Sequence, residues 1–328
     1  MATSTTKYGN HVGRFGVIAD IQFVDAEDGT DFTGVQVRRY RNSLEVLKIA
    51  VKRWSEGDGV EFVAQLGDII DVKARDRGSA EEDCETVLSV LKKCKTKGLV
   101  NIIGNHDLYC FKRDKLNSLL NTKRDEHTWY SFKPISENPL KIVVLDSYDI
   151  STIEGSSVKN TQAAFTFLSQ HNPNDITRFG GDWSAGLTGL GKRFMPYNGM
   201  VGEEQLAWLR ETLAASSVCG ESVVILSHAP FCPGGCDPIC LLWNYQEVLD
   251  VIKESEVVVA VFAGHDHDGG YKVHEGVHHL TFPSPLLCKE DDTAFATVEM
   301  YQGCMVFRGE GMGLPKELEM KYISSEIN

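Results

Sequence analysis

The sequence predicts an α/β fold built around a mixed β-sheet. Apolar, β-branched runs alternate with amphipathic helical stretches between residues 15 and 265. Beyond residue 270 the pattern shortens into strand-like pieces, which is typical of antiparallel strands that close a sheet. The chain has 328 residues, of which 42% are hydrophobic and 24% are charged. This length suits one large domain or two small ones, and we expect a single domain over residues 1–328.

The expected elements follow in order along the chain. Each strand is a short apolar run rich in Val and Ile, and the six runs occupy residues 15–20, 61–68, 99–105, 141–146, 222–228 and 257–265. Helical spacing of apolar residues predicts helices near residues 37–56, 80–97, 202–216 and 243–254. Residues 147–200 interrupt this alternation and are rich in Ser, Gly, Asn and Pro. A loop this long inside a domain is usually functional, so we expect a lid or insert there.

Composition limits the partners and the compartment. The net charge of −13 repels polyanions, so a nucleic acid polymer is not expected as a partner. The longest apolar runs are strand-sized, the first residues resemble no secretory signal and the last match no common targeting tail, so no membrane partner is expected. Nine scattered cysteines without an N-x-[ST] sequon favour reduced thiols and a cytoplasmic location.

Three of the cysteines are spaced closely enough to be considered as a separate zinc site. Cys232, Cys236 and Cys240 are each separated by three residues, whereas structural zinc more often uses two distant C-x-x-C pairs. Both a small zinc site and plain loop cysteines remain open, and the spacing favours the second.

Residues of metal-ligand type gather at the strand ends. A single Asp after a strand is usually a turn or cap residue, and a single His is usually packing or surface. Five of the six expected strands share this bias, which is hard to explain by chance. The carboxyl ends of strands in α/β sheets open onto a common crevice, so these side chains are expected to meet there. They are Asp20, Asp68, Asn105, His228 and His265.

The motifs around these residues carry a family resemblance. In order they read D-I-Q (20–22), G-D-I-I-D (67–71), G-N-H-D (104–107), S-H-A-P (227–230) and G-H-D-H (264–267). This set resembles the calcineurin-type metallophosphoesterase superfamily. The resemblance implies two mixed sheets packed as a sandwich and flanked by helices (α/β/β/α), with a dimetal site at the carboxyl ends of the strands.

The resemblance also implies a ligand set for two divalent metal ions. Asp68 would bridge the ions, because a carboxylate can offer one oxygen to each. The first ion would be held by Asp20, Gln22, Asp68 and His267. The second ion would be held by Asp68, Asn105, His228 and His265.

The implied chemistry is hydrolysis of a phosphate compound by a metal-bound hydroxide. Two divalent ions, less the two aspartates and the hydroxide, leave about one positive charge to attract an anionic substrate. In the family, the position of His106 acts on the leaving-group side, and Asp107 is expected to orient its other ring nitrogen. Asp71 is expected to orient a metal ligand rather than to bind metal.

Position 22 departs from the superfamily pattern, because Gln stands where His is usual. An amide oxygen favours Mn²⁺ or Mg²⁺ over zinc, although zinc or iron could accompany the purified protein. The variant motif, with GVIADIQFVDAEDGTDF and AGHDHDGGY, is similar to the manganese-dependent ADP-ribose/CDP-alcohol pyrophosphatases. This similarity implies cleavage of the diphosphate linkage in ADP-ribose, CDP-choline and related small nucleoside-diphosphate compounds, with Mn²⁺ preferred.

Four further residues are candidate substrate contacts. Phe32 and Tyr109 could stack on a base, Tyr197 lies in the lid candidate, and Arg38 could grip a second phosphate. The alternatives are that the aromatic rings cover the core edge and that Arg38 is simply solvated.

Two other functions remain open on the same sequence. A phosphomonoesterase or protein phosphatase could use the same dimetal core, with a more open site. A non-catalytic interaction module would be expected to lack His106 or several ligands, and neither loss is seen.

Overall fold

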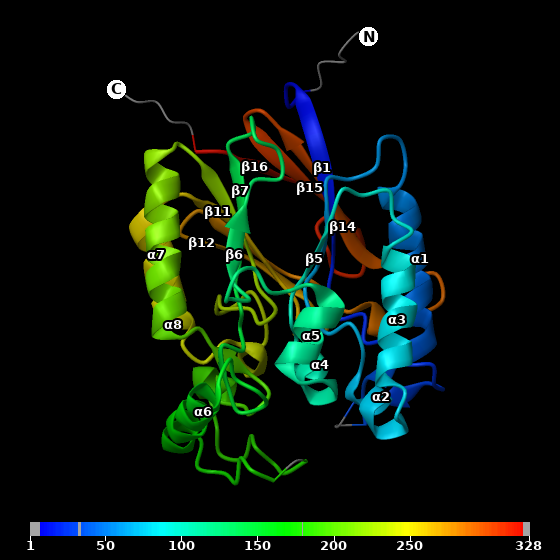
Figure 1. The fold of residues 1–328 in the computed structure, drawn as a ribbon, viewed down its shortest axis with the longest axis vertical. Helices are drawn as coiled ribbons and strands as arrows, with labels where there is room; N and C mark the ends of the chain where they lie inside the picture. The colour runs from blue at the N-terminus through cyan, green and yellow to red at the C-terminus, as the bar shows by residue number, and fades with distance from the viewer. Residues whose placement is uncertain (1–6, 32–33, 179, 324–328) are drawn as a thin grey trace.

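Two six-stranded sheets form the centre of the molecule, as the computed structural model shows for residues 7–31, 34–178 and 180–323 (Figure 1). The first sheet has the order β16-β15-β14-β1-β4-β5, in which β1, β4 and β5 are parallel and the other pairs are antiparallel. Its strands are β1 (His11–Ile18), β4 (Val63–Gln65), β5 (Leu99–Asn101), β14 (Ala294–Tyr301), β15 (Cys304–Gly311) and β16 (Leu318–Lys321).

The second sheet has the order β12-β13-β11-β10-β7-β6. Its four central strands run parallel, and the edge strands β12 and β6 pair antiparallel. Its strands are β6 (Tyr130–Phe132), β7 (Leu140–Val144), β10 (Ser222–Leu226), β11 (Val258–Ala263), β12 (Gly270–His274) and β13 (Val277–Thr281). The central strands are nearly continuous apolar runs because both of their faces are covered.

The sheets pack face to face through an apolar core. Phe15 of the first sheet and Phe262 of the second are both fully buried in it. The rings of Phe15 and Phe62 stack at 4.6 Å between centroids, and the rings of Phe15 and Phe262 lie 6.4 Å apart. The expected pair of mixed sheets flanked by helices is therefore confirmed.

Helices cover the outer faces of the sandwich, on opposite sides in Figure 1. The first sheet packs against α1 and α3, and the second sheet packs against α7 and α8. The fully buried Trp54 joins α1 to the first sheet, since its indole N–H donates to the Ala296 carbonyl at 3.1 Å. The helices are α1 (Tyr40–Trp54), α2 (Val72–Arg77), α3 (Ala80–Leu91), α4 (Asn105–Cys110), α5 (Arg113–Leu120), α6 (Val158–His171), α7 (Glu203–Val218) and α8 (Tyr245–Ser255).

Residues 147–200 contain more regular structure than their composition predicts. The segment holds β8 (Ile150–Ser151), α6, the 3₁₀ helix η1 (Gly189–Arg193) and β9 (Gly199–Met200), and β8 pairs with β9. The Ser157 side chain caps α6 by accepting a hydrogen bond from the Asn160 amide. The remaining elements are β2 (Gly29–Thr30), β3 (Val37–Arg38), η2 (Pro238–Cys240) and η3 (Pro285–Leu287). None of the helices in the described part of the chain has the length and apolar character needed to cross a bilayer.

Candidate metal centre

The predicted ligands lie just beyond the carboxyl ends of strands from both sheets. Asp20, Asp68 and Asn105 follow β1, β4 and β5 of the first sheet, while His228 and His265 follow β10 and β11 of the second. The parallel strands of each sheet therefore deliver these side chains to one edge of the sandwich, where α/β folds place their sites.

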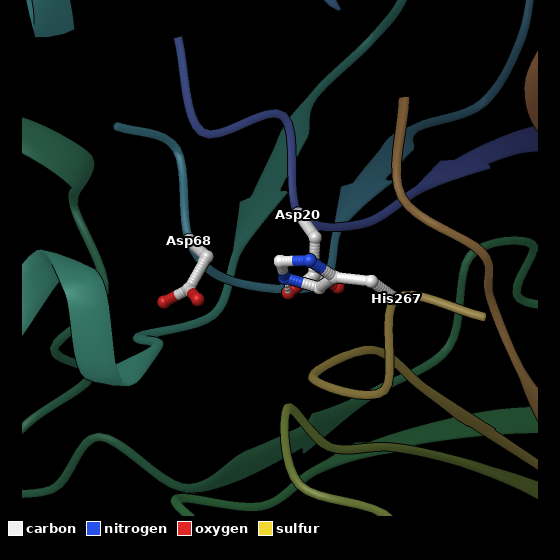
Figure 2. A group of neighbouring side chains, drawn as sticks. All are labelled: Asp20, Asp68 and His267. Atoms are coloured by element: carbon white, nitrogen blue, oxygen red, sulfur yellow. Dashed lines mark ion pairs between the residues drawn. The ribbon is translucent and has the colours of Figure 1, made fainter. Parts of the chain in front are cut away.

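The residues assigned to the first metal ion converge closely. One ligand atom from each of Asp20, Asp68 and His267 lies within 4.8 Å of the other two (Figure 2). Among the described His, Cys, Asp and Glu residues, this is the one group of three with ligand atoms so close together. His267 Nε2 is 3.7 Å from Asp20 Oδ1. Gln22 lies between Asp68 and His267, with its Nε2 at 2.9 Å from Asp68 Oδ2 and at 2.8 Å from His267 Nε2.

The residues assigned to the second ion surround the other side of Asp68. His228 Nε2 is 3.7 Å from Asp68 Oδ2 and 3.3 Å from Asn105 Oδ1. The rings of His228 and His265 lie 5.1 Å apart between centroids. Asp68 thus touches both groups, which is the position that a bridging carboxylate requires.

Two buried oxygen atoms in this cluster fit a bound cation. Asp20 Oδ1 and Gln22 Oε1 are buried and have no hydrogen-bond partner among the described residues. An unpaired buried oxygen is costly, and a divalent cation beside Asp20 would satisfy its Oδ1 directly. The amide nitrogen of Gln22 faces Asp68 and His267, so a half-turn of the amide would present its oxygen to an ion held by those two residues.

The backbone of four predicted ligands is held in an unusual conformation. Asp20, Gln22, Asp68 and His265 have positive φ angles of 49°, 44°, 56° and 71°. Such conformations are uncommon for residues other than glycine and gather at functional sites, where the surrounding structure enforces them. Asp20 and Gln22 follow β1, Asp68 follows β4 and His265 follows β11, so these left-handed residues turn the chain just beyond the strand ends.

Glycines in the motifs allow the ligand loops to pack against one another. A Cβ atom at Gly104 would lie 2.0 Å from Asp68 Oδ1, and a Cβ atom at Gly264 would lie 2.3 Å from Asp20 Oδ2. The glycine before each ligand of one motif therefore makes room for a ligand of another motif.

The electrostatics of the cluster suit metal binding. Burial lowers the pKa values of His228, His265 and His267, which keeps these rings in the neutral form that binds metals. Burial and the nearby Asp68 carboxylate raise the pKa of Asp20. Two buried carboxylates this close repel each other, and a cation between them would remove that repulsion.

Asp71, rather than Asp107, lies beside the ring of His106. Asp71 Oδ2 is 3.2 Å from His106 Nδ1, and it also accepts a hydrogen bond from Arg38 Nη1 at 2.7 Å. Although burial alone would raise the pKa of Asp71, the charges of His106 and Arg38 lower it to about 2. The expectation that Asp107 orients His106 therefore differs from the structure, which gives this place to Asp71.

The Asp107 carboxylate instead holds the ligand loops together. Its two oxygens accept hydrogen bonds from the backbone amides of Asp68, Ile69 and Gly104, at 2.9 to 3.0 Å. It thereby joins the G-D-I-I-D loop to the G-N-H-D loop. The sequence motif alone does not reveal this role, because Asp107 is adjacent in the chain to His106 but points to the opposite side.

Three of the four candidate substrate contacts lie next to residues of the candidate metal centre. Tyr109 packs edge-on against His106 with ring centroids 5.9 Å apart, and Tyr197 packs edge-on against His265 at 5.8 Å. Arg38 is held near the candidate metal centre by its hydrogen bond to Asp71, and its Nε atom is buried without a hydrogen-bond partner among the described residues. Phe32 lies outside the described residues.

Two site residues escaped the sequence analysis. Asn198 places its Oδ1 at 2.6 Å from His265 Nε2, and Tyr148 donates its hydroxyl to Asn105 Oδ1 at 3.2 Å. Both are fully buried. Neither belongs to a ligand motif, and an Asn before Gly199 reads as an ordinary turn residue.

The three closely spaced cysteines gain no support as a zinc site. Cys232, Cys236 and Cys240 are free thiols. Among the described residues, no group of three possible metal ligands that includes one of them comes as close together as Asp20, Asp68 and His267. The reading as plain loop cysteines is the one that fits.

The fold, the order of the motifs and the converging ligands define a metallophosphoesterase, and the comparison with known families agrees. Residues 13–269 match the calcineurin-like phosphoesterase family, to which the chain therefore belongs.

The most informative relatives share one name. The chain is 38% identical over 303 residues to the manganese-dependent ADP-ribose/CDP-alcohol diphosphatase of Oryza sativa subsp. japonica, covering 90% of each chain. It is 37% identical over 317 residues to the Homo sapiens protein of the same name, again covering 90% of each. Among solved structures, it resembles a dimetal phosphatase from Danio rerio with a TM-score of 0.87, 34% identity and coverage of 96% of this chain and all of that one.

Proposed function

We propose that the protein is a Mn²⁺-dependent hydrolase that cleaves the diphosphate linkage of small nucleoside-diphosphate compounds. ADP-ribose would give AMP and ribose 5-phosphate, and CDP-choline or CDP-glycerol would give CMP and a phospho-alcohol. The observation that carries the proposal is the convergence of Asp20, Gln22, Asp68 and His267 at one edge of the sandwich. The shared name of relatives that align over about 90% of the chain supports the substrate class.

Seven residues would hold the two ions in the arrangement set out above. The bound ions would supply positive charge to the diphosphate and lower the pKa of water towards neutrality. An amide oxygen from Gln22 makes the donor set of the first ion rich in oxygen, which supports Mn²⁺ over zinc. The ligands are Asp20, Gln22, Asp68, Asn105, His228, His265 and His267.

His106 would serve the leaving group. Its Nδ1 faces the Asp71 carboxylate and the Val72 amide, so the ring is held at that edge and Nε2 is left as its working atom. A proton donated from Nε2 would neutralise the charge that develops on the departing phosphate. Asp71 positions this ring, and it also holds the Arg38 guanidinium beside the centre, where a second phosphate could bind.

A phosphomonoesterase or protein phosphatase on the same core remains the second candidate. The experiment that separates them uses protein stripped with a chelator and refilled with Mn²⁺, Mg²⁺ or Zn²⁺. Each form is offered ADP-ribose, CDP-choline and a phosphopeptide. We expect AMP release from ADP-ribose, fastest with Mn²⁺, whereas phosphopeptide turnover without AMP release would contradict the proposal.

We further propose that the chain is a single domain, with residues 147–200 as an insert, and that it works in the cytoplasm on small molecules. The net charge of −13 argues against nucleic acid polymers and membranes as partners. All nine cysteines are free, which fits a reducing compartment.

A further inference from the structure

Asn198 is held in one orientation by two backbone carbonyls. Its Nδ2 donates to the carbonyls of Arg193 and Ile239, each at 2.8 Å. A carbonyl can only accept, so the atom facing these two groups must be the amide nitrogen. Oδ1 is therefore the atom that faces His265, and it can only accept.

The orientation of Asn198 determines which ring nitrogen of His265 carries the proton. Oδ1 of Asn198 lies 2.6 Å from Nε2 of His265, so Nε2 must be the N–H donor of that hydrogen bond. In a neutral ring the lone pair then remains on Nδ1. Only Nδ1 of His265 is left to bind a cation.

The same reasoning gives His228 the opposite tautomer. Its Nδ1 lies 2.8 Å from the Leu66 carbonyl, so Nδ1 carries the proton. Its Nε2 is left with the lone pair and faces Asn105 Oδ1 and Asp68 Oδ2, at 3.3 and 3.7 Å. Each histidine is thus fixed by a partner outside the ligand motifs.

We propose that Asn198 is a positioning residue, which holds His265 as the Nε2–H tautomer and so assigns Nδ1 to the second metal ion. The proposal rests on the proposed dimetal function. It gives the insert at residues 147–200 a direct part in the metal centre, because Asn198 lies at the end of that segment. Partners of this kind outside the ligand shell typically account for about 10- to 100-fold in metal affinity.

The chain offers a matched control for this residue. Asn172 is also buried in the insert and also donates through Nδ2 to two backbone carbonyls, those of Trp183 and Phe194. Its Oδ1 accepts from Asn174 and contacts no predicted ligand. Loss of Asn172 therefore tests the structural part of the Asn198 role without its contact with His265.

The experiment measures Mn²⁺ binding to metal-free full-length protein, without substrate, in the wild type and in Asn198→Leu, Asn198→Asp and Asn172→Leu. We expect Asn198→Leu to weaken one of the two binding events by about 10- to 100-fold. Asn198→Asp keeps an acceptor for His265 but places an oxygen against the two carbonyls, so it should bind Mn²⁺ less tightly than the wild type and more tightly than Asn198→Leu. Asn172→Leu should also bind like the wild type.

A spectroscopic measurement tests the tautomer directly. Long-range ¹H–¹⁵N correlation spectra of the metal-free wild type, with His265 assigned by its loss in His265→Gln, should show a protonated Nε2 and an unprotonated Nδ1. A protonated Nδ1 would overturn the proposal, even if the Asn198→Leu protein fails to fold. Equal Mn²⁺ affinity in Asn198→Leu, or equal losses in Asn198→Asp and Asn198→Leu, would also overturn it.

Failure of the proposed function would look different. A wild-type protein that bound fewer than two Mn²⁺ ions, or bound two without hydrolysing a diphosphate, would contradict the function. A wild type that bound and hydrolysed as expected, with an Asn198→Leu variant indistinguishable from it, would contradict only the role of Asn198.

Discussion

At the scale of single residues, neighbours in the chain make different contacts at the candidate metal centre. His106 faces Asp71, whereas the adjacent Asp107 faces away and binds three backbone amides. The four-residue motif therefore contains a candidate metal ligand, Asn105, a histidine that we propose serves the leaving group, and a carboxylate that anchors two loops. The motif predicts that all of them belong to the site, but only the fold shows what each side chain contacts.

These two roles can be separated by mutation. His106→Ala removes a side chain that is not among the predicted metal ligands, so we expect hydrolysis of ADP-ribose to fall about 10²- to 10⁴-fold while Mn²⁺ binding stays close to that of the wild type. Asp107→Asn places an amide against backbone N–H groups, which should weaken Mn²⁺ binding and lower stability by about 1–3 kcal/mol.

The measurements are steady-state kinetics, Mn²⁺ titration and denaturant unfolding. Unchanged Mn²⁺ binding and stability in Asp107→Asn would show that the carboxylate does not hold the two loops in the way the structure indicates.

The candidate metal ligands were predicted from residue types that are themselves informative. Asp and His at strand ends are distinctive, and the structure brings all seven predicted ligands together. Asn198 and Tyr148 could not be found in the same way, because their importance lies in a contact with a residue remote in the chain. Their burial is an outcome of the fold rather than of local pattern.

At the scale of elements, the strand cores were predicted correctly but their ends were not. The expected strand at 257–265 ends at Ala263, and the one at 61–68 ends at Gln65. In each case the chain turns just beyond the strand end, with positive φ angles at His265 and at Gly67 and Asp68. Apolar periodicity carries no signal for such a turn, since Asp and His adopt both conformations.

The sequence did not predict helices in segments whose composition is typical of loops. The helix α6 lies in a segment rich in Ser, Gly, Asn and Pro, where its Ser157 cap was the available clue. The helices α1, α3, α7 and α8 were predicted from apolar residues at helical spacing, and the apolar faces of α1 and α8 are the most distinct.

The helix α1 offers a test of the outer core of the first sheet. Leu47 is fully buried there, whereas Ile49 on the same helix is 47% exposed. Leu47→Ala should lower the free energy of unfolding by about 2–5 kcal/mol, because it leaves a cavity. Ile49→Ala should change it by less than about 0.5 kcal/mol. Denaturant unfolding of both variants checks the pair, and similar losses at the two positions would contradict the packing.

At the scale of the whole molecule, the metal centre joins the two sheets. Asp20 and Asp68 come from the first sheet, while His228, His265 and His267 come from the second. An ion bound by both groups would stabilise the folded state over the unfolded chain, in which these residues are scattered.

Mn²⁺ should therefore raise the thermal stability of the protein. At a free concentration about 100 times the dissociation constant, we expect about 2.7 kcal/mol of added stability, which a chelator should remove. The Asp68→Ala variant lacks the bridging carboxylate and should respond far less. Scanning calorimetry with and without Mn²⁺ measures both, and an equal response in the variant would argue against a shared ligand at this position.

The apolar interface between the sheets has a further consequence for catalysis. Because each ion would draw ligands from both sheets, the side chains that fill the sandwich, Phe15 and Phe262 among them, would fix the separation between the two halves of each ligand set. A smaller side chain at Phe15 or Phe262 would leave a cavity between the two sheets that supply the ligands. Such a substitution touches no ligand, yet it should weaken Mn²⁺ binding together with the fold.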